Sequence, residues 1–85
     1  MPEISRFFGI IIRMYYSEHG VAHFHADYGN DSATIAVESL GVLAGSLPPR
    51  VFGMVLEWAA LPREELLEDW RLLRAGRTPR QIAPL

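Results

Sequence analysis

Hydrophobic and polar residues follow two different periods along this chain, and the change falls near residues 48–49, which are both proline. Before this point, glycine, aromatic and β-branched residues are common, and the pattern has the period of two that is typical of strands. After it, leucine, alanine, glutamate and arginine recur with helical spacing. A strand-rich half followed by a helix-rich half predicts an α+β domain.

The first half predicts three strands, with a short fourth strand as an open alternative. Residues 7–16 form a run of aromatic and aliphatic residues, and we expect one long strand that is apolar on both faces and covered on both. Residues 22–28 and 32–38 alternate between apolar and polar positions, and residues 41–44 are the candidate fourth strand. Because the connections are short, we expect an antiparallel meander of three or four strands.

The second half predicts two helices. A proline suits the first turn of a helix over residues 49–60, and this segment is apolar on most sides, so it should be buried on most sides. A second helix is expected over residues 63–75, with acidic residues in its first turn and arginines in its last turn. We expect both helices to pack on one face of the sheet, the face that carries Phe24, Ile35 and Val37.

The length of 85 residues allows one domain, with a strand-rich part at 1–46, a helical part at 48–76 and an extended tail at 77–85. A hydrophobic content of 49% excludes intrinsic disorder, yet no apolar run reaches the roughly 18 residues of a membrane helix. The chain has no cysteine, which excludes disulfides, cysteine nucleophiles and thiolate metal ligands. No signal-peptide pattern begins it, so we expect a cytoplasmic protein with no membrane association.

One cluster of residues has the chemistry of a site. On the second predicted strand, His23, His25 and Asp27 share the face opposite Phe24, at steps of about 6.5–7 Å, and His19 in the preceding turn can fold over the end of this row. Imidazoles and a carboxylate are ligands of zinc and other divalent transition metals. The sequence therefore predicts a metal site made of His19, His23, His25 and Asp27.

Other readings of the same cluster stay open. The three histidines are also candidates for metal-free acid–base catalysis, because histidine titrates near neutral pH. Asp31 and Glu38 are candidates for a further ligand, and Arg13 is a candidate anion site if it lies on the same face. Polar residues on the solvent face of a half-covered sheet also need no function at all, so a purely structural or interface role of the cluster is a further alternative.

Several stretches of the chain carry motifs of a known family. They are Ile-Ser-x-Phe-x-Gly-Ile-x-Ile-x-Met-Tyr at 4–15, His-Phe-His-Ala-x-Tyr-Gly at 23–29, Leu-Glu-Trp-Ala at 56–59, Arg-Glu-Glu-Leu-Leu at 63–67 and Ile-x-Pro-Leu at 82–85. With these motifs the chain resembles the bacterial family catalogued as domain of unknown function 4160. That family typically has a proline before its His-Phe-His, where this chain has Ala22. The resemblance implies no established activity, but it implies a protein partner in a toxin–antitoxin-like pair.

Two function classes follow. The first is a small interaction module that forms a homodimer or binds a protein partner, because residues 7–16 and 51–61 hold more apolar surface than one thin core requires. The alternative is a metal-assisted or histidine-based hydrolase or nuclease that uses His19, His23 and His25. Nucleic-acid binding is not favoured, because the net charge is −2 and the eight basic residues are scattered.

Overall fold

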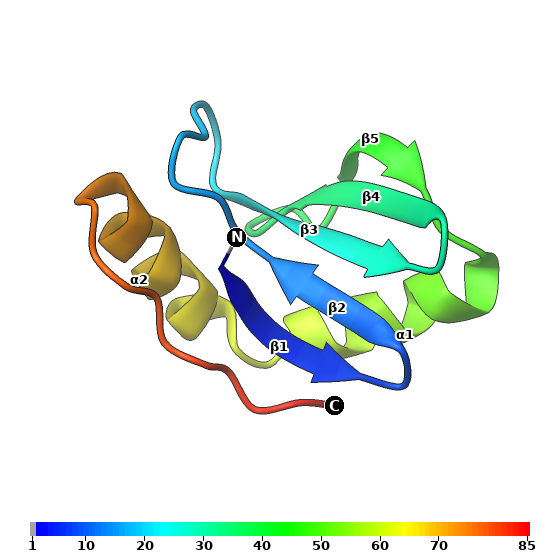
Figure 1. The fold of residues 1–85 in the computed structure, drawn as a ribbon. Coiled ribbons are helices and arrows are strands. Elements are labelled where there is room, and N and C mark those ends of the chain that lie inside the picture. The colour runs from blue at the N-terminus through cyan, green and yellow to red at the C-terminus, as the bar shows by residue number, and fades with distance from the viewer. Residues whose placement is uncertain (1) are drawn as a thin grey trace.

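The computed structural model describes residues 2–85, and it shows a five-stranded antiparallel sheet followed by two helices. The strands lie side by side in chain order, as a meander (Figure 1). Their bounds are Glu3–Phe7 for β1, Ile10–Arg13 for β2, His23–Tyr28 for β3, Asp31–Ala36 for β4 and Val42–Ser46 for β5. The helices are Pro49–Ala59 for α1 and Arg63–Arg74 for α2. The predicted α+β meander is confirmed, with five strands in place of three or four.

The extra strand arises because the single strand expected over residues 7–16 is wrong. The chain turns at Phe8 and Gly9, which have φ of 49° and 79°, and Phe7 pairs with Ile10 across this turn. Glycine adopts this backbone region without strain, and the turn carries Phe8 into solvent, where it is 69% exposed. The hairpin therefore brings Ile4 and Phe7 of β1 and Ile10 and Ile12 of β2 into the core, whereas Ile11 lies on the opposite face and is only partly buried.

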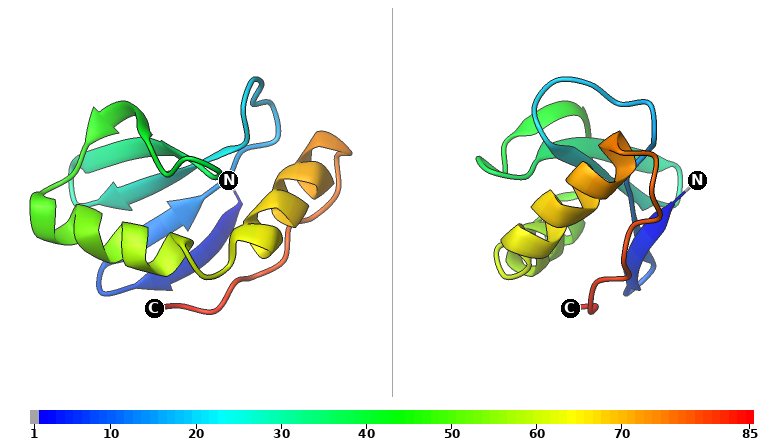
Figure 2. Two further views of the ribbon diagram at one scale, coloured as in Figure 1. Left: turned by 180° about the vertical axis from the view of Figure 1, so that it is seen from behind. Right: turned by 90° about the vertical axis from the view of Figure 1, so that its left-hand side faces the viewer.

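Both helices lie on the same side of the sheet, as Figure 2 shows from behind and from one end. The ring of Trp58 on α1 packs edge-on against Phe24 on β3, with ring centroids 5.9 Å apart, and against Phe7 at 5.4 Å. Phe24, Ile35 and Val37 are completely buried, as the sequence predicted for the helix-facing side. In residues 2–85 no helix is long and apolar enough to cross a bilayer.

The last nine residues contain no helix or strand, but they are fixed to the domain. The backbone N–H of Ile82 donates to the carbonyl of Ile4 at 2.7 Å, and the Gln81 side chain donates to the carbonyl of Glu3 at 2.6 Å. The indole N–H of Trp58 donates to the carbonyl of Ala83 at 2.8 Å. The tail therefore runs along the outer edge of β1, where Figure 1 shows it in red.

Asp69 on α2 holds the start of this tail and is only 1% exposed. Its Oδ1 accepts a hydrogen bond from the backbone N–H of Arg80 at 2.8 Å, whereas its Oδ2 has no partner. Burial raises the pKa of Asp69, and the charges of Glu65 and Glu68 add to this rise, against the opposing effects of Arg80. The tail is thus tied down by a carboxyl group that is costly to ionise.

We expect Ile82→Ala to lower the free energy of unfolding by about 2 kcal/mol, because it removes a side chain that is 4% exposed and packed in the core. Urea denaturation measures this loss. Arg77→Ala is the matched control in the same tail, since that side chain is exposed and the expected change is within about 0.5 kcal/mol. Equal stabilities of the two variants would show that the tail does not contribute to the fold.

We expect Asp69→Asn to raise the melting temperature at neutral pH. In the unfolded chain the Asp69 carboxyl loses its proton near pH 3.8, and in the folded protein it does so at a higher pH. Between these two pH values the folded state holds more protons than the unfolded state, so the free energy of unfolding falls as pH rises. The asparagine keeps the acceptor for Arg80 and removes the charge, so the fall should disappear. Glu57→Gln, at an exposed acid of α1, should keep the wild-type profile.

Candidate metal centre

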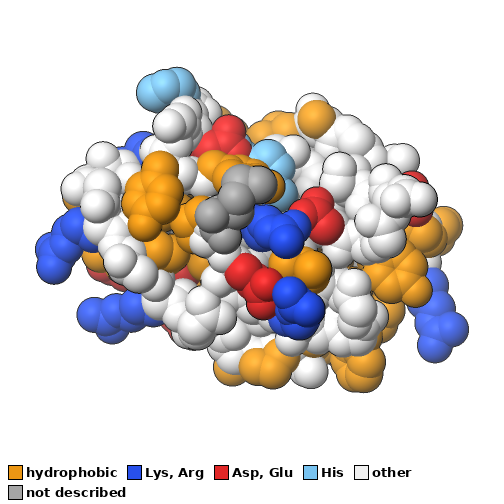
Figure 3. Space-filling model, viewed as in Figure 1, with side chains coloured by type: hydrophobic (Ala, Val, Ile, Leu, Met, Phe, Trp, Pro, Cys, Tyr) orange, Lys and Arg blue, Asp and Glu red, His pale blue; other side chains and the backbone are white. Residues whose placement is uncertain are grey.

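The site lies at the start of β3, where this strand follows the loop over residues 14–22. His23 and His25 are two residues apart on β3, so their side chains share the face opposite the buried Phe24. His25 pairs with Arg13 on β2 and with Thr34 on β4, which places it in the middle of the open face. Acidic, basic and histidine side chains gather on this face, which the helices leave uncovered (Figure 3).

Glu18 in the loop completes the cluster. Its Oε1 lies 3.3 Å from Nε2 of His23 and is in direct hydrogen-bond contact with Nε2 of His25. One ligand atom from each of the three residues lies within 4.8 Å of the others. Among residues 2–85 no other three histidine or acidic side chains form such a group. The arrangement places two imidazole nitrogens and one carboxylate oxygen around one point.

The other nitrogen of each ring has its own protein partner. Nδ1 of His23 lies 2.8 Å from the carbonyl of Val21, and because a carbonyl only accepts, this nitrogen carries the proton. Nδ1 of His25 lies 3.2 Å from the hydroxyl of Thr34, which can donate or accept. These bonds fix both rings so that Nε2 points towards Glu18. Histidines that bind metals have this second hydrogen bond almost without exception, because it sets the tautomer and the ring orientation.

The carboxyl group of Glu18 is poised to be ionised. Burial raises its pKa, but the hydrogen bond and charge of His25, and then those of His23, hold it below its usual value. Oε1 of Glu18 and the Nε2 atoms of the two imidazoles therefore face one another. A divalent cation would use the same three lone pairs.

The cluster is buried on one side and open on the other. His23 is 7% exposed and its ring lies 4.9 Å from the ring of Trp70 on α2. His25 is partly exposed, and the ring of Tyr15 packs edge-on against it at 4.6 Å. Glu18 is also partly exposed. A bound ion would therefore have protein ligands on one side and space for water or a substrate on the other.

Arg74, at the end of α2, connects the helix to the loop that carries Glu18. Its Nη2 donates to the carbonyls of Tyr15 and Tyr16 at 2.8 and 2.7 Å. Its guanidinium group also lies over the ring of Trp70, 4.3 Å from the ring centre. Through these contacts the loop, the helix and His23 form one packed unit. Arg74 and Trp70 are thus positioning residues for the cluster.

The structure brings together only part of the set of residues proposed from the sequence. His23 and His25 are adjacent, as expected, but His19 is exposed and lies outside the group. Asp27 forms an ion pair with Arg13 across β2 and β3, so each of these two candidates already has a partner. Ligation of a metal by His19 or Asp27, and of an anion by Arg13, stays a prediction that this geometry does not favour.

Glu18 is the member that the sequence reading missed. It directly precedes His19 in the same predicted turn, and strand periodicity gives no direction for a side chain in a turn. The other two candidate ligands are also outside the group. Glu38 is exposed beyond the end of β4, and Asp31 lies at the opposite end of that strand, where it pairs with Tyr28.

Two histidines and one carboxylate are a ligand set of catalytic zinc sites and of non-haem iron sites. In such sites three protein ligands hold the ion and one or more positions stay open for water or substrate. Glu18, His23 and His25 fit this set in donor type and in number. Glu18 and His25 are both partly exposed, so solvent reaches the cluster from that side.

Comparison with known proteins gives a family and no activity. No curated protein and no solved structure matches the chain. A family model described as Domain of unknown function (DUF4160) matches residues 9–71, which include all three residues of the cluster and Trp70. The resemblance seen in the sequence motifs is confirmed. Because this match spans most of the 85 residues, the chain belongs to the DUF4160 family.

Proposed function

We propose that the protein binds a divalent transition metal, with zinc as the first choice, through Glu18, His23 and His25. One observation carries the proposal: both Nε2 atoms and the Glu18 carboxylate converge within 4.8 Å, while both Nδ1 atoms are held by Val21 and Thr34. Zinc suits the set because it prefers nitrogen and oxygen ligands at about 2.0–2.2 Å.

The chemistry that best suits such a centre is hydrolysis. A zinc ion with three protein ligands lowers the pKa of a bound water to near 7 and polarises a carbonyl or phosphoryl oxygen. The protein's own part is to hold the ion on the rigid strand β3 and to leave one side open to solvent. We therefore propose metal-assisted hydrolysis, with RNA and phosphate esters as the first substrates to test.

We expect purified protein to take up one zinc ion per chain, with a higher melting temperature in zinc than in chelator, because a ligand that binds only the folded state stabilises it. Calorimetric titration and elemental analysis measure the uptake. Glu18→Gln and His25→Ala should weaken binding at least tenfold, and His19→Ala, a neighbouring exposed histidine, should leave it unchanged. Chelator added in excess should remove the ion and return the melting temperature to that of the metal-free protein.

The same variants separate binding from catalysis. Zinc-dependent cleavage of RNA or a phosphate ester that disappears in Glu18→Gln and persists in His19→Ala supports the hydrolase. Zinc uptake without turnover would restrict the function to metal binding. Absence of zinc uptake at neutral pH, or uptake that depends on His19 in place of Glu18, would contradict the site itself.

We expect Arg74→Ala to weaken zinc binding about tenfold. This is the smallest loss of metal affinity that is typical when a residue that orients a metal ligand is removed. The reason is that Arg74 holds the loop of Glu18 through two backbone carbonyls. Arg71→Ala, one turn earlier on α2, is the matched control, since Arg71 pairs only with the exposed Glu68. Unchanged affinity in Arg74→Ala, at equal thermal stability, would show that the loop needs no such support.

We propose protein association as the second function, and strand β5 is the observation that favours it. All residues of β5 are exposed, and Val42 and Leu43 are exposed aliphatic residues on it. The apolar surplus of residues 7–16 no longer supports association, because Phe7, Ile10 and Ile12 enter the core. A partner in a toxin–antitoxin-like pair belongs to this second proposal. The absence of cysteine agrees with a cytoplasmic setting for either function.

A further inference from the structure

The two edges of the sheet differ. The outer edge of β1 is covered by the C-terminal tail, through the hydrogen bond from Ile82 to Ile4. Strand β5 forms the opposite edge (Figure 1), and among residues 2–85 the backbone of Val42–Ser46 has hydrogen-bond partners only in β4. An open edge offers a row of N–H and C=O groups, and besides water only another extended backbone satisfies such a row.

This edge also lacks the residues that usually prevent pairing. No charged residue occurs between Glu38 and Arg50, and within β5 there is no proline and no lysine. Instead, Val42 and Leu43 are 47% and 52% exposed. An uncharged edge with exposed aliphatic side chains is a surface that favours strand pairing.

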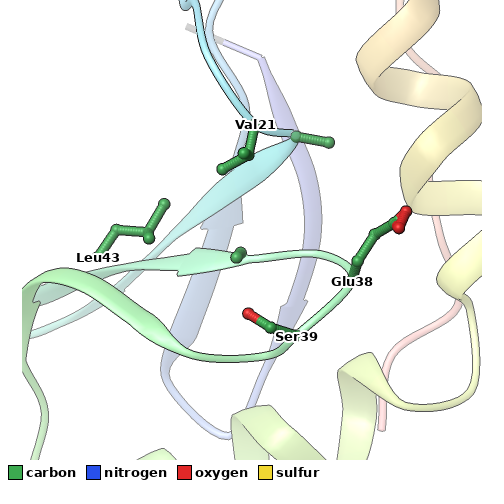
Figure 4. Close-up of a pocket in the computed structure, with 6 residues that line it drawn as sticks. Val21, Glu38, Ser39 and Leu43 are labelled. Carbon is green, nitrogen blue, oxygen red and sulfur yellow. The ribbon is translucent and has the colours of Figure 1, made fainter.

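A hollow of about 460 Å³ extends this apolar surface. It is lined by Val21, Ala22, Ala36, Glu38, Ser39 and Leu43, and the side chains of Val21 and Leu43 converge over it (Figure 4). Val21 is itself exposed. The apolar surface thus continues from β5 across the ends of β3 and β4, and Glu38 is the single charged residue in its lining.

We propose that β5 pairs with β5 of a second copy of this chain, antiparallel and about a twofold axis at Ala44, which deepens the second function proposed above. In this register Leu43 lies opposite Gly45 of the second copy, and Val42 lies opposite Ser46. Each large side chain therefore meets a small residue, and no like charges come together. The same patch on both copies makes the interface closed, and the two sheets continue as one.

The shape of β5 limits the strength of this pairing. Leu43 is an extra residue in β5, because Ala44 pairs with Thr34 and Val42 pairs with the next residue, Ile35. Gly45 has φ of 75°. A Cβ at Gly45 would lie 2.2 Å from the carbonyl oxygen of Ser32, so the chain needs glycine here. Bulges of this kind twist an edge and shorten the part that can pair. We therefore expect a weak dimer in exchange with the monomer.

The test measures the molar mass in solution by sedimentation or light scattering. The protein concentration is raised from dilute solution to about 1 mM, which corresponds to the weak end of specific association. We expect the mass to rise towards twice that of the chain, and Leu43→Lys to keep it at the monomer value. Leu61→Lys is the matched control, because Leu61 is 84% exposed and lies between the helices, away from β5. It should dimerise as the wild type does.

A second measurement locates the contact without a variant. Backbone amide signals of Val42–Ser46 should shift with protein concentration in NMR spectra, while those of β1 stay constant. A monomer at every concentration would overturn the inference, and so would a dimer that Leu43→Lys leaves intact. Measurements in chelator and in zinc separate the dimer from the metal site. A protein that binds no zinc but still dimerises contradicts only the metal centre.

Discussion

The alternation of side chains along β3 is the constraint on which both the core and the site depend. β3 is the central strand of the sheet, and its successive residues point to opposite faces. Phe24 and Ala26 enter the core beneath α1, and His23 and His25 therefore lie on the opposite face, where Trp70 of α2 covers His23 and His25 is partly exposed. A register slip of one residue would turn the histidines into the core and Phe24 out of it, so the packing of Phe24 on Trp58 also fixes the direction of the ligands.

The cluster is assembled from four separate parts of the chain. Glu18 comes from a loop, the histidines from β3, Thr34 from β4, and Trp70 with Arg74 from α2. Backbone pairing holds β3 and β4, and the hydrogen bonds from Arg74 hold the loop to α2. Without metal, the Glu18 carboxylate and the two imidazoles contact one another directly. A bound cation would take the place of these contacts.

The helical half contributes more than cover for the sheet. α1 provides Trp58, which binds the tail and packs on two strands, and α2 provides Asp69 for the tail and Arg74 for the loop. The tail in turn closes the β1 edge and leaves β5 as the edge available for pairing. In a domain of 85 residues, which has little core, such long-range polar contacts hold segments that hydrophobic burial alone would leave loose.

The sequence by itself determined the α+β class, the two helices, the strands β3 and β4, and the shared face of His23 and His25, because these depend on local periodicity and residue type. It did not separate β1 from β2, since the turn at Phe8–Gly9 is short and lies inside a continuous run of strand-forming residues. Only the tertiary structure decided that Glu18, and not His19, joins the histidines. Arg74, 56 positions beyond Glu18, binds that loop through two backbone carbonyls, and no local pattern carries information about so distant a contact.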